Sequence, residues 1–310
     1  MILITGAAGF IGLNYIQKLL SDDFTEFVVV DKLTYAANRE PFFNLVVPFE
    51  RVDISNVVEL EKVFKKYNIE AVINFAAESH VDNSINDCMP FVHTNIVGTV
   101  NLLQLSLKYS VKKFLQISTD EVFGEVEYPK TFNENSVLNP RNPYSASKTS
   151  AEHFVNAFHN TYGLNTLIVN CSNNYGPYQH EEKLIPKTIT RALSDKKIPV
   201  YGQGLQVRDW IFVEDAVNAI HTVFEKGTYG ERYCISGMFE ITNIELVKKI
   251  LDILGKSHDL IEYVTDRPGH DFRYCTDCSK LMNTLGWKPL LKINDGLKKT
   301  IEWIENENRI

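Results

Sequence analysis

The chain has 310 residues, of which 44% are hydrophobic and 23% are charged, and its formal net charge is −7. This length exceeds the usual size of a single hydrophobic core and predicts two lobes, while an acidic balance without a basic patch disfavours a nucleic-acid partner. No apolar run reaches the roughly 18 residues that span a bilayer, and the strand-like first residues leave no room for a signal peptide, so we expect a soluble cytoplasmic protein with no membrane partner.

The five cysteines are odd in number and scattered along the chain, which fits reduced thiols better than a disulfide framework. Two of them, Cys275 and Cys278, form a C-x-x-C pair. No second pair stands at zinc-like spacing, and no Gly-Pro redox context surrounds this one. We therefore interpret the pair as a chance surface feature and expect no metal site.

Short apolar strands alternate with amphipathic helical segments through the first half of the chain. This alternation is typical of βαβ units in a parallel sheet with helices on both faces. The sequence therefore predicts an α/β fold with a Rossmann-type doubly wound parallel sheet and a smaller C-terminal lobe. The predicted strands cover residues 1–5, 27–31, 71–77, 113–119 and 166–170.

Three predicted helices begin with a capping signature. A side chain that accepts a hydrogen bond from the first turn, or a proline at that turn, marks each start. The signatures are Asn56 with Glu59, Asn142 before Pro143, and Thr242 with Glu245. Apolar residues continue at helical spacing after the third signature as far as Gly255, where we expect that helix to end.

A glycine-rich turn follows the first predicted strand and precedes an amphipathic helix. Gly6 permits the tight turn, Gly9 lets the backbone approach a pyrophosphate, and Gly12 allows close packing of helix on strand. The next strand ends in Asp31, about 20 residues beyond the last glycine, where a carboxylate can accept from ribose hydroxyls and would repel a 2′-phosphate. The first part of the chain is therefore predicted to bind NAD rather than NADP.

A Tyr-x-x-x-Lys pair, Tyr144 and Lys148, lies on one face of the helix that Asn142 opens. A cation one turn away can help to lower the tyrosine pKa, so that the phenolate takes a proton from a sugar or alcohol hydroxyl. Tyr109 and Lys113 have the same spacing. That second pair lies where a helix should end before a strand, so we assign it a packing or surface role.

Two adjacent carboxylates, Asp120 and Glu121, follow Thr119 at the end of a predicted strand. They add acid and base capacity that a simple dehydrogenase does not need. Adjacent residues in an extended segment point in different directions, so the two groups can serve neighbouring substrate atoms. One of the two carboxyl groups would have to be protonated to act as an acid, which requires a pKa raised by burial beside the other. His80 lies in a loop after a strand and is left out of the catalytic set.

These motifs together resemble the extended short-chain dehydrogenase/reductase family and, within it, the nucleotide-sugar 4,6-dehydratases. The resemblance runs from residue 1 to about residue 275. The matching segments are residues 5–12, 31–35, 74–82, 118–122, 144–148, 171–178, 182–186, 207–210 and 266–271. It implies an NAD-binding Rossmann domain over residues 1–170, with sheet elements from later segments, and a mainly substrate-binding lobe over residues 171–310 that is interleaved with the first.

The resemblance also implies a reaction: oxidation of a hexose at C4, loss of water across C5 and C6, and reduction at C6 with bound NAD. It assigns Tyr144, with Lys148 and Thr119, to the oxidation, Glu121 to the C5 proton and Asp120 to the C6 hydroxyl. We expect dTDP-glucose as substrate, with UDP-glucose or another nucleotide hexose as the alternative. A UDP-sugar 4-epimerase or decarboxylase would not require the two carboxylates. A non-catalytic NAD-sensing regulator would normally have lost the tyrosine or the lysine.

Binding residues and an oligomer follow from the same resemblance. Two phosphates on an acidic protein need nearby cations, for which Arg208 and Arg267 are the best candidates. We expect a homodimer formed through helices near residues 94–109 and 144–162. The implied cofactor residues are Gly6, Gly9, Phe10, Ile11, Gly12, Asp31, Lys32, Thr34, Asp53, Ile54, Phe75, Ala76, Ala77, Thr94, Tyr144, Lys148 and Asn174. The implied substrate residues are Ser79, Thr119, Asn173, Lys183, Leu184, Arg208, Asn243, Arg267 and His270.

Overall fold

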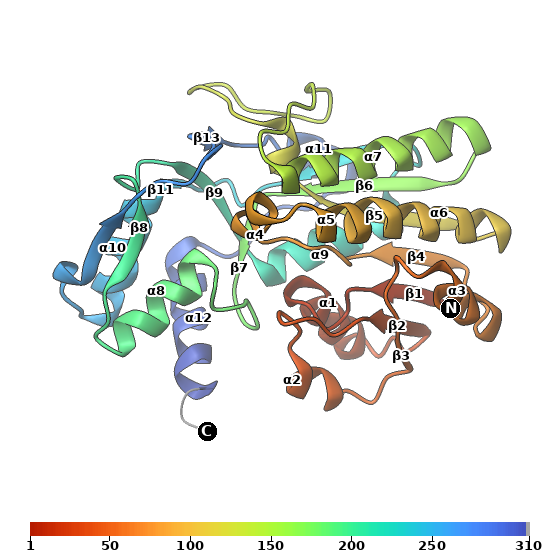
Figure 1. Ribbon diagram of the computed structural model, residues 1–310, viewed down its shortest axis with the longest axis horizontal. Helices are drawn as coiled ribbons and strands as arrows, with labels where there is room; N and C mark the ends of the chain where they lie inside the picture. The colour runs from red at the N-terminus through yellow and green to blue at the C-terminus, as the bar shows by residue number, and fades with distance from the viewer. Residues whose placement is uncertain (308–310) are drawn as a thin grey trace.

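A parallel sheet of seven strands forms the centre of the larger part of the computed structural model, which describes residues 1–307 (Figure 1). Its strand order is β10-β6-β5-β4-β1-β2-β3, and every neighbouring pair is parallel. The predicted doubly wound α/β fold is therefore confirmed. The strands are β1 (Ile2–Thr5), β2 (Phe27–Asp31), β3 (Phe49–Arg51), β4 (Ala71–Asn74), β5 (Lys113–Thr119), β6 (Thr166–Cys171) and β10 (Arg232–Ile235).

One predicted strand, over residues 71–77, is shorter than expected. β4 ends at Asn74, although Phe75 still donates a backbone hydrogen bond to the Thr5 carbonyl. The chain then passes directly against the glycine-rich turn, where a Cβ atom added to Gly6 would lie 2.5 Å from the Ala76 nitrogen. Close backbone contact with that turn replaces strand pairing beyond Asn74.

Helices cover both faces of this sheet, because alternate strand residues point to opposite sides. Leu3 of β1 packs in the core on one face, whereas Ile4 packs in the core on the other. No helix within residues 1–307 is long and apolar enough to cross a membrane. On the Ile4 face lie α1 (Phe10–Ser21), α9 (Val213–Lys226) and α11 (Ser279–Leu285); on the Leu3 face lie α3 (Val57–Lys66), α6 (Thr99–Lys108) and α7 (Pro143–Tyr162).

A second, smaller lobe lies beyond the carboxyl end of the sheet and has a core of its own (Figure 1). Its four-stranded sheet contains β11 (Glu240–Thr242), β9 (Val207–Phe212), β13 (Arg273–Tyr274) and β7 (Asn173–Tyr175), and β8 (Ile198–Tyr201) pairs with β12 (Ile261–Val264). Its helices are α8 (Leu184–Leu193), α10 (Asn243–Leu254) and α12 (Ile293–Glu307). Because β10 returns to the seven-stranded sheet, the two parts are interleaved along the chain.

Short elements complete the described chain. All but the last of them connect strands of the main sheet, and the last lies inside the second lobe between α10 and β12. They are α2 (Arg39–Phe43), α4 (Val81–Asn86), α5 (Met89–Phe91), a π-helix (Val92–Gly98) and 3₁₀ turns at Asp120–Phe123 and His258–Leu260. The π-helix runs directly into α6, so the segment expected as one helix near residues 94–109 begins with a wider turn.

Two of the three capping signatures form as predicted. Asn142 and Thr242 each cap a helix reciprocally with the residue three positions on, and α10 ends at Gly255 in the left-handed conformation. Asn56 accepts a hydrogen bond from the Glu59 nitrogen, but the Glu59 carboxylate pairs with a lysine instead of returning to the cap. That third cap is therefore one-sided.

The C-x-x-C pair is not on the surface. Cys275 and Cys278 are free, and they are 7% and 1% exposed. Cys278 precedes α11 and its thiol lies 3.7 Å from the Met282 sulfur. Burial raises the pKa of Cys278 to about 11, so its thiol is neutral at ordinary pH. The interpretation as a surface feature is wrong, because both side chains are core packing.

Gly6 and Gly163 make a matched pair for testing the glycine-rich turn. Both have left-handed backbones, with φ of +67° and +69°, but a Cβ atom at Gly163 meets no atom within 4 Å. We expect Gly163→Ala to lower the free energy of unfolding by about 1 kcal/mol, from backbone strain alone. Gly6→Ala should lower it clearly further, because the backbone at Ala76 must move. Urea unfolding measures both, and equal losses would contradict the close contact.

Candidate active site

Two adjoining cavities lie between the carboxyl ends of the main strands and the second lobe. The first cavity is lined by the glycine-rich turn, the end of β2, and residues of β5 and α7. The second cavity is lined by α4, α8, β8 and β9, together with the segment around Arg267. Ser79, Gln179, Glu182 and Lys183 line both. A ligand that enters one cavity can therefore reach the other.

The glycine-rich turn gives the first cavity a polar, positively polarised end. α1 begins at Phe10. The N-cap residue before it, Gly9, has no side chain that could accept from the free N–H groups of the first turn. The Asp31 carboxylate accepts hydrogen bonds from the Ala8 nitrogen at 3.0 Å and the Leu33 nitrogen at 2.7 Å. These contacts fix an acceptor beside a helix N-terminus, the combination that suits a ribose joined to a pyrophosphate.

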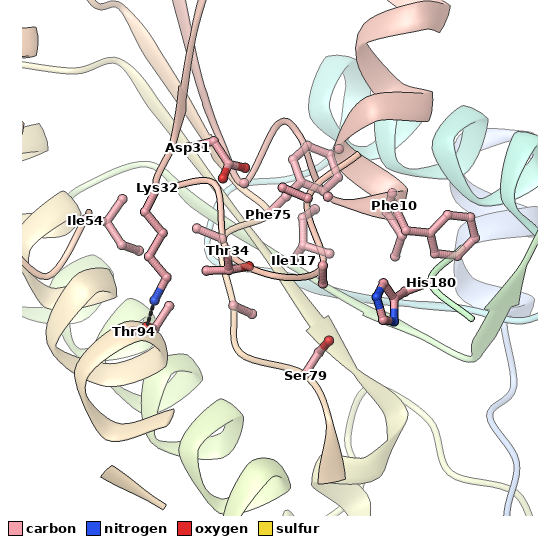
Figure 2. Close-up of a pocket in the computed structure, with 18 of the residues that line it drawn as sticks. Phe10, Asp31, Lys32, Thr34, Ile54, Phe75, Ser79, Thr94, Ile117 and His180 are labelled. Carbon is pink, nitrogen blue, oxygen red and sulfur yellow. Dashed lines mark hydrogen bonds between the residues drawn. The ribbon is translucent and has the colours of Figure 1, made fainter. Parts of the chain in front are cut away.

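The backbone packs so closely around the glycines that no side chain fits at these positions of the cavity wall. A Cβ atom at Gly12 would lie 2.3 Å from the Gly6 carbonyl oxygen. Along one edge of the cavity, Lys32 extends beside Ile54 and donates to the Thr94 hydroxyl at 3.0 Å (Figure 2), and it pairs with Glu78 at 3.0 Å. The shape and the donor set therefore fit a dinucleotide.

Fifteen of the seventeen residues expected to bind the cofactor line the first cavity. They are Gly6, Gly9, Phe10, Ile11, Gly12, Asp31, Lys32, Thr34, Ile54, Phe75, Ala76, Ala77, Thr94, Tyr144 and Lys148. The other two lie elsewhere. Asp53 accepts from the backbone and hydroxyl of Ser55 and is 3.8 Å from the Lys32 amine, while Asn174 lines the second cavity.

Sequence reasoning also missed part of this wall. Ile117 and Ser118 line the cavity directly before Thr119, and their place at the end of a predicted strand could have identified them. Ala36 and Ala37 carry no polar group that would have drawn attention. His180 reaches the cavity from the other lobe (Figure 2), which no local pattern in the sequence indicates.

Tyr144 and Lys148 lie side by side on α7 at the inner end of the first cavity. The Lys148 amine donates to the Ile117 carbonyl at 2.7 Å, and burial lowers its pKa to about 8. Burial, and then the charge of Glu121, raise the pKa of Tyr144, while a hydrogen bond with Thr119 opposes the shift. The expected lowering by the lysine is wrong for the protein alone, because burial outweighs a cation that is directed at a carbonyl.

Asp120 and Glu121 open a 3₁₀ turn rather than continuing the strand, and they face different surroundings. Asp120 is 2% exposed, and burial, followed by the charges of Glu121 and Asp209, holds its pKa well above the ordinary value. Glu121 lines the second cavity and accepts from the Asn142 amide at 3.2 Å. The expected protonated acid is therefore beside an accessible carboxylate. Thr119 and Asp120 themselves line neither cavity wall.

The second cavity is lined by buried polar atoms that have no partner within residues 1–307. Such atoms are costly unless a polar ligand binds them. They are Asn173 Oδ1, Asn174 Oδ1, Gln179 Oε1, Trp210 Nε1, Asn243 Oδ1 and Arg267 Nε. Three of the six residues, Asn173, Asn243 and Arg267, were expected to bind substrate. Their chemistry fits a ligand rich in acceptors and donors, such as a nucleoside diphosphate.

The two arginines of the second cavity differ in how many of their donors are already hydrogen-bonded within the protein. Arg208 donates to the carbonyls of Val207, Asp271 and Phe272 and stacks on a tyrosine ring, so its orientation is fixed by backbone. Arg267 pairs with Asp82 at 3.1 Å but keeps its Nε free. Arg267 is thus the better placed of the two for an incoming phosphate.

The remaining substrate residues expected from sequence are also placed. Lys183 donates to the Ser79 carbonyl at 3.0 Å, and burial lowers its pKa. Burial lowers the pKa of His270 to about 4, so that ring is neutral. Leu184 lies on the same wall, and Thr119 is the exception noted above. His80, which was left out of the catalytic set, accepts from the Asn83 nitrogen as the cap of α4 and also lines the second cavity.

Three aromatic residues of this wall, Tyr201, Trp210 and Tyr274, were missed. They come from β8, β9 and β13, three separate strands of the second lobe. Trp210 belongs to a segment that carried the resemblance, so its place could have been inferred. The other two are ordinary strand residues by pattern, and only the tertiary fold brings them together.

Comparisons with known proteins agree with this geometry. Residues 3–300 match the family described as GDP-mannose 4,6 dehydratase. The dTDP-glucose 4,6-dehydratases of Haemophilus influenzae and Neisseria meningitidis serogroup B are 46% and 45% identical, each over 97% of this chain and over 97% and 92% of their own lengths.

Among solved structures, a dTDP-glucose 4,6-dehydratase is likewise more similar in sequence to this chain than a UDP-glucose 4-epimerase is. The dTDP-glucose 4,6-dehydratase DesIV of Streptomyces venezuelae, crystallised with NAD, superposes with a TM-score of 0.95 at 40% identity over 99% of this chain and 97% of its own. The Thermus thermophilus UDP-glucose 4-epimerase with NAD has a TM-score of 0.92 but 28% identity, over 98% of both chains. The chain therefore belongs to this family of NAD-dependent nucleotide-sugar dehydratases and epimerases, and within it to the dTDP-glucose 4,6-dehydratase group.

Proposed function

We propose that the protein converts dTDP-glucose to dTDP-4-keto-6-deoxyglucose with bound NAD. The observation that carries this proposal is the juxtaposition of a tyrosine/lysine pair on the wall of the first cavity with one buried acid and one accessible carboxylate on the wall of the second. Tyrosine and lysine suit oxidation of a hydroxyl. The added acid and base suit elimination of water.

The first cavity would hold the cofactor. Its glycine-rich turn and the N-terminus of α1 would bind the pyrophosphate, and Asp31 would accept from the adenosine ribose. The chemistry that bound NAD would supply is hydride transfer: hydride would leave C4 of the sugar and return to C6 at the end of the cycle, as a proton returns to C5. The protein's own residues handle the protons.

Tyr144 would take the proton of the C4 hydroxyl. Thr119 is the neighbour that favours the phenolate, and Lys148 would supply the positive charge that a phenolate needs. The high pKa of Tyr144 in the protein alone makes the cationic surroundings of the loaded site important for this step. The product is a ketone at C4.

The C4 ketone acidifies the neighbouring C5 proton, which Glu121 would remove. Asp120, kept protonated by burial, would donate its proton to the C6 hydroxyl as water leaves. The two carboxyl groups belong to adjacent residues but face different surroundings. They can therefore act as base and acid without sharing one proton.

The second cavity would hold the nucleoside diphosphate, with Arg267 as a direct phosphate ligand. We expect Arg267→Lys to raise KM for dTDP-glucose by about tenfold, because lysine lacks the fork of donors that binds phosphate oxygens. Arg191→Lys on α8, outside both cavities, is the matched control and should leave KM unchanged. Steady-state kinetics of both variants tests this expectation. An unchanged KM for Arg267→Lys would show that Arg267 does not bind the phosphates.

We also propose a cytoplasmic homodimer formed through α6 and α7. These helices pack together and leave apolar side chains at the surface, including Val97 before α6, and Phe154 and Tyr162 on α7. We propose that residues 1–170 form the cofactor-binding domain and that residues 171–310 mainly form the substrate-binding domain. The two are interleaved, as their sheets are. Sedimentation of wild type and Phe154→Asp tests the dimer, and two identical sedimentation coefficients would count against this surface.

Incubation of the purified protein with dTDP-glucose, without added reductant, tests the proposed activity. The expected product has lost one water, as seen by mass spectrometry. Parallel assays with UDP-glucose compare the two nucleotides. Conversion to a product of unchanged mass would indicate an epimerase, and unchanged substrate with every nucleotide hexose would exclude the dehydratase.

A further inference from the structure

A buried carboxylate that the proposed chemistry does not use lies one helical turn beyond Lys148. Glu152 is 0% exposed on α7, and Tyr144, Lys148 and Glu152 follow one face of that helix at intervals of four residues. Burial raises the pKa of Glu152, and the Arg232 guanidinium opposes this most strongly. Burying a carboxylate costs free energy unless other groups pair with it. The groups that contact Glu152 therefore indicate its role in the protein.

The contacts of Glu152 lead to the backbone of the catalytic strand. Its Oε1 accepts from the Asn170 amide nitrogen at 2.7 Å, and the same nitrogen donates to the Thr119 carbonyl at 2.9 Å. Its Oε2 accepts from Arg232 at 2.5 Å. Glu152 therefore joins α7 to β6 and β10, and through Asn170 it reaches the end of β5.

Glu152 also acts on the lysine of the redox pair. Lys148 is anchored to the Ile117 carbonyl, two residues before Thr119 on the same strand. Burial lowers the pKa of Lys148, and the charge of Glu152 is the largest opposing influence, with the Cys171 thiol of β6 as the other. One carboxylate thus favours the charged form of Lys148 and, through Asn170, is linked to the strand end that carries Thr119.

We propose that the Glu152–Arg232 ion pair is a positioning device for C4 oxidation, which holds Lys148 and the carboxyl end of β5 in the arrangement that Tyr144 and Thr119 require. Glu152 lines neither cavity, so it acts through those residues and does not touch the substrate. This inference rests on the proposed dehydratase function. It concerns the oxidation step and not the elimination.

Glu152→Gln tests the proposal, because glutamine keeps the acceptor for Asn170 and removes the charge. We expect kcat measured above pH 9 to fall by about tenfold, the change that one pKa unit makes in the ammonium fraction of Lys148 at a pH above its pKa of about 8. KM for dTDP-glucose should not change. The primary isotope effect on kcat with C4-deuterated substrate should increase, because oxidation becomes slower relative to the later steps. Glu61→Gln, which breaks an ion pair with Lys108 on the surface, is the control and should match wild type.

The double variant Glu152→Gln with Arg232→Met separates positioning from folding. It removes both charges together, so it leaves no buried charge without a partner. A pair that serves only folding would give a stable double variant with wild-type kcat and isotope effect, which would overturn the proposal. We expect the double variant to keep the lowered kcat and the larger isotope effect.

Lysine NMR provides a readout that does not depend on turnover. The ε-carbon resonance of Lys148, identified by its absence from Lys148→Met, should titrate at lower pH in Glu152→Gln than in wild type, because a negative charge that favours the ammonium is gone. Identical titrations in the two proteins would overturn the inference. Failure of wild type to dehydrate dTDP-glucose would instead refute the proposed function, and the titration would still be measurable.

Discussion

Tyr144→Phe should lower the turnover of dTDP-glucose by about 10²–10⁴-fold, the usual contribution of a positioned proton acceptor. The variant removes only the hydroxyl that would take the C4 proton. Its ring packs against Val81 and Phe91, and this packing is retained by phenylalanine. We therefore expect a folded protein that binds nucleotide normally. Turnover is followed as product lighter by one water.

Tyr109→Phe is the matched control, because Tyr109 and Lys113 repeat the spacing of the catalytic pair. The Tyr109 hydroxyl donates to Glu61 at 2.8 Å, and the Lys113 amine donates to the Phe224 carbonyl, away from both cavities. The control should lose about 1 kcal/mol of stability from one hydrogen bond and no activity. Wild-type turnover by Tyr144→Phe would show that another group accepts the C4 proton.

The first cavity is the more predictable of the two from sequence, because its parts are local. The turn around Gly6 and the strand end at Asp31 are each specified within a few residues, and parallel strands bring their carboxyl ends to one edge. Asn142 likewise marks the start of the helix that carries Tyr144. Patterns of this kind need no knowledge of distant contacts.

Features that depend on burial could not be predicted in the same way. The pKa of Tyr144 is raised and not lowered, because the side chain is enclosed by segments that are remote in sequence. Cys275 and Cys278 pack inside, although nothing in their spacing indicates it. The aromatic residues Trp210 and Tyr274 of the second cavity belong to strands that are more than 60 residues apart in the sequence. Only the folded lobe brings them together.

The strand end at Thr119 separates the two halves of the proposed reaction. Thr119 still belongs to β5, whereas Asp120 and Glu121 belong to the 3₁₀ turn that follows. The change of backbone conformation places one carboxyl group in the interior and the other at the second cavity. Oxidation and elimination can therefore be interrupted separately by substitutions at neighbouring positions.

Glu121→Gln should stop elimination while C4 oxidation continues. Glutamine preserves the side-chain shape and an oxygen that can accept from Asn142, but it cannot take a proton from C5. We expect dehydration to fall by about 10²–10⁴-fold. In deuterated water the sugar should gain no deuterium at C5, and a quenched reaction should contain the 4-keto form with its C6 hydroxyl intact. Dehydration at the wild-type rate would show that Glu121 is not the base.

Asp120→Asn makes the complementary test, because it leaves the base and removes the acid. Glu121 can then still remove the C5 proton, but the C6 hydroxyl leaves without protonation. We expect slow dehydration together with deuterium exchange at C5, the opposite of the labelling expected for Glu121→Gln. Asparagine also matches the neutral state that burial favours at this position, so the fold should be retained. Exchange lost in both variants would mean that the two carboxyl groups act as a single unit, whereas exchange kept only in Asp120→Asn assigns the base to Glu121 and the acid to Asp120.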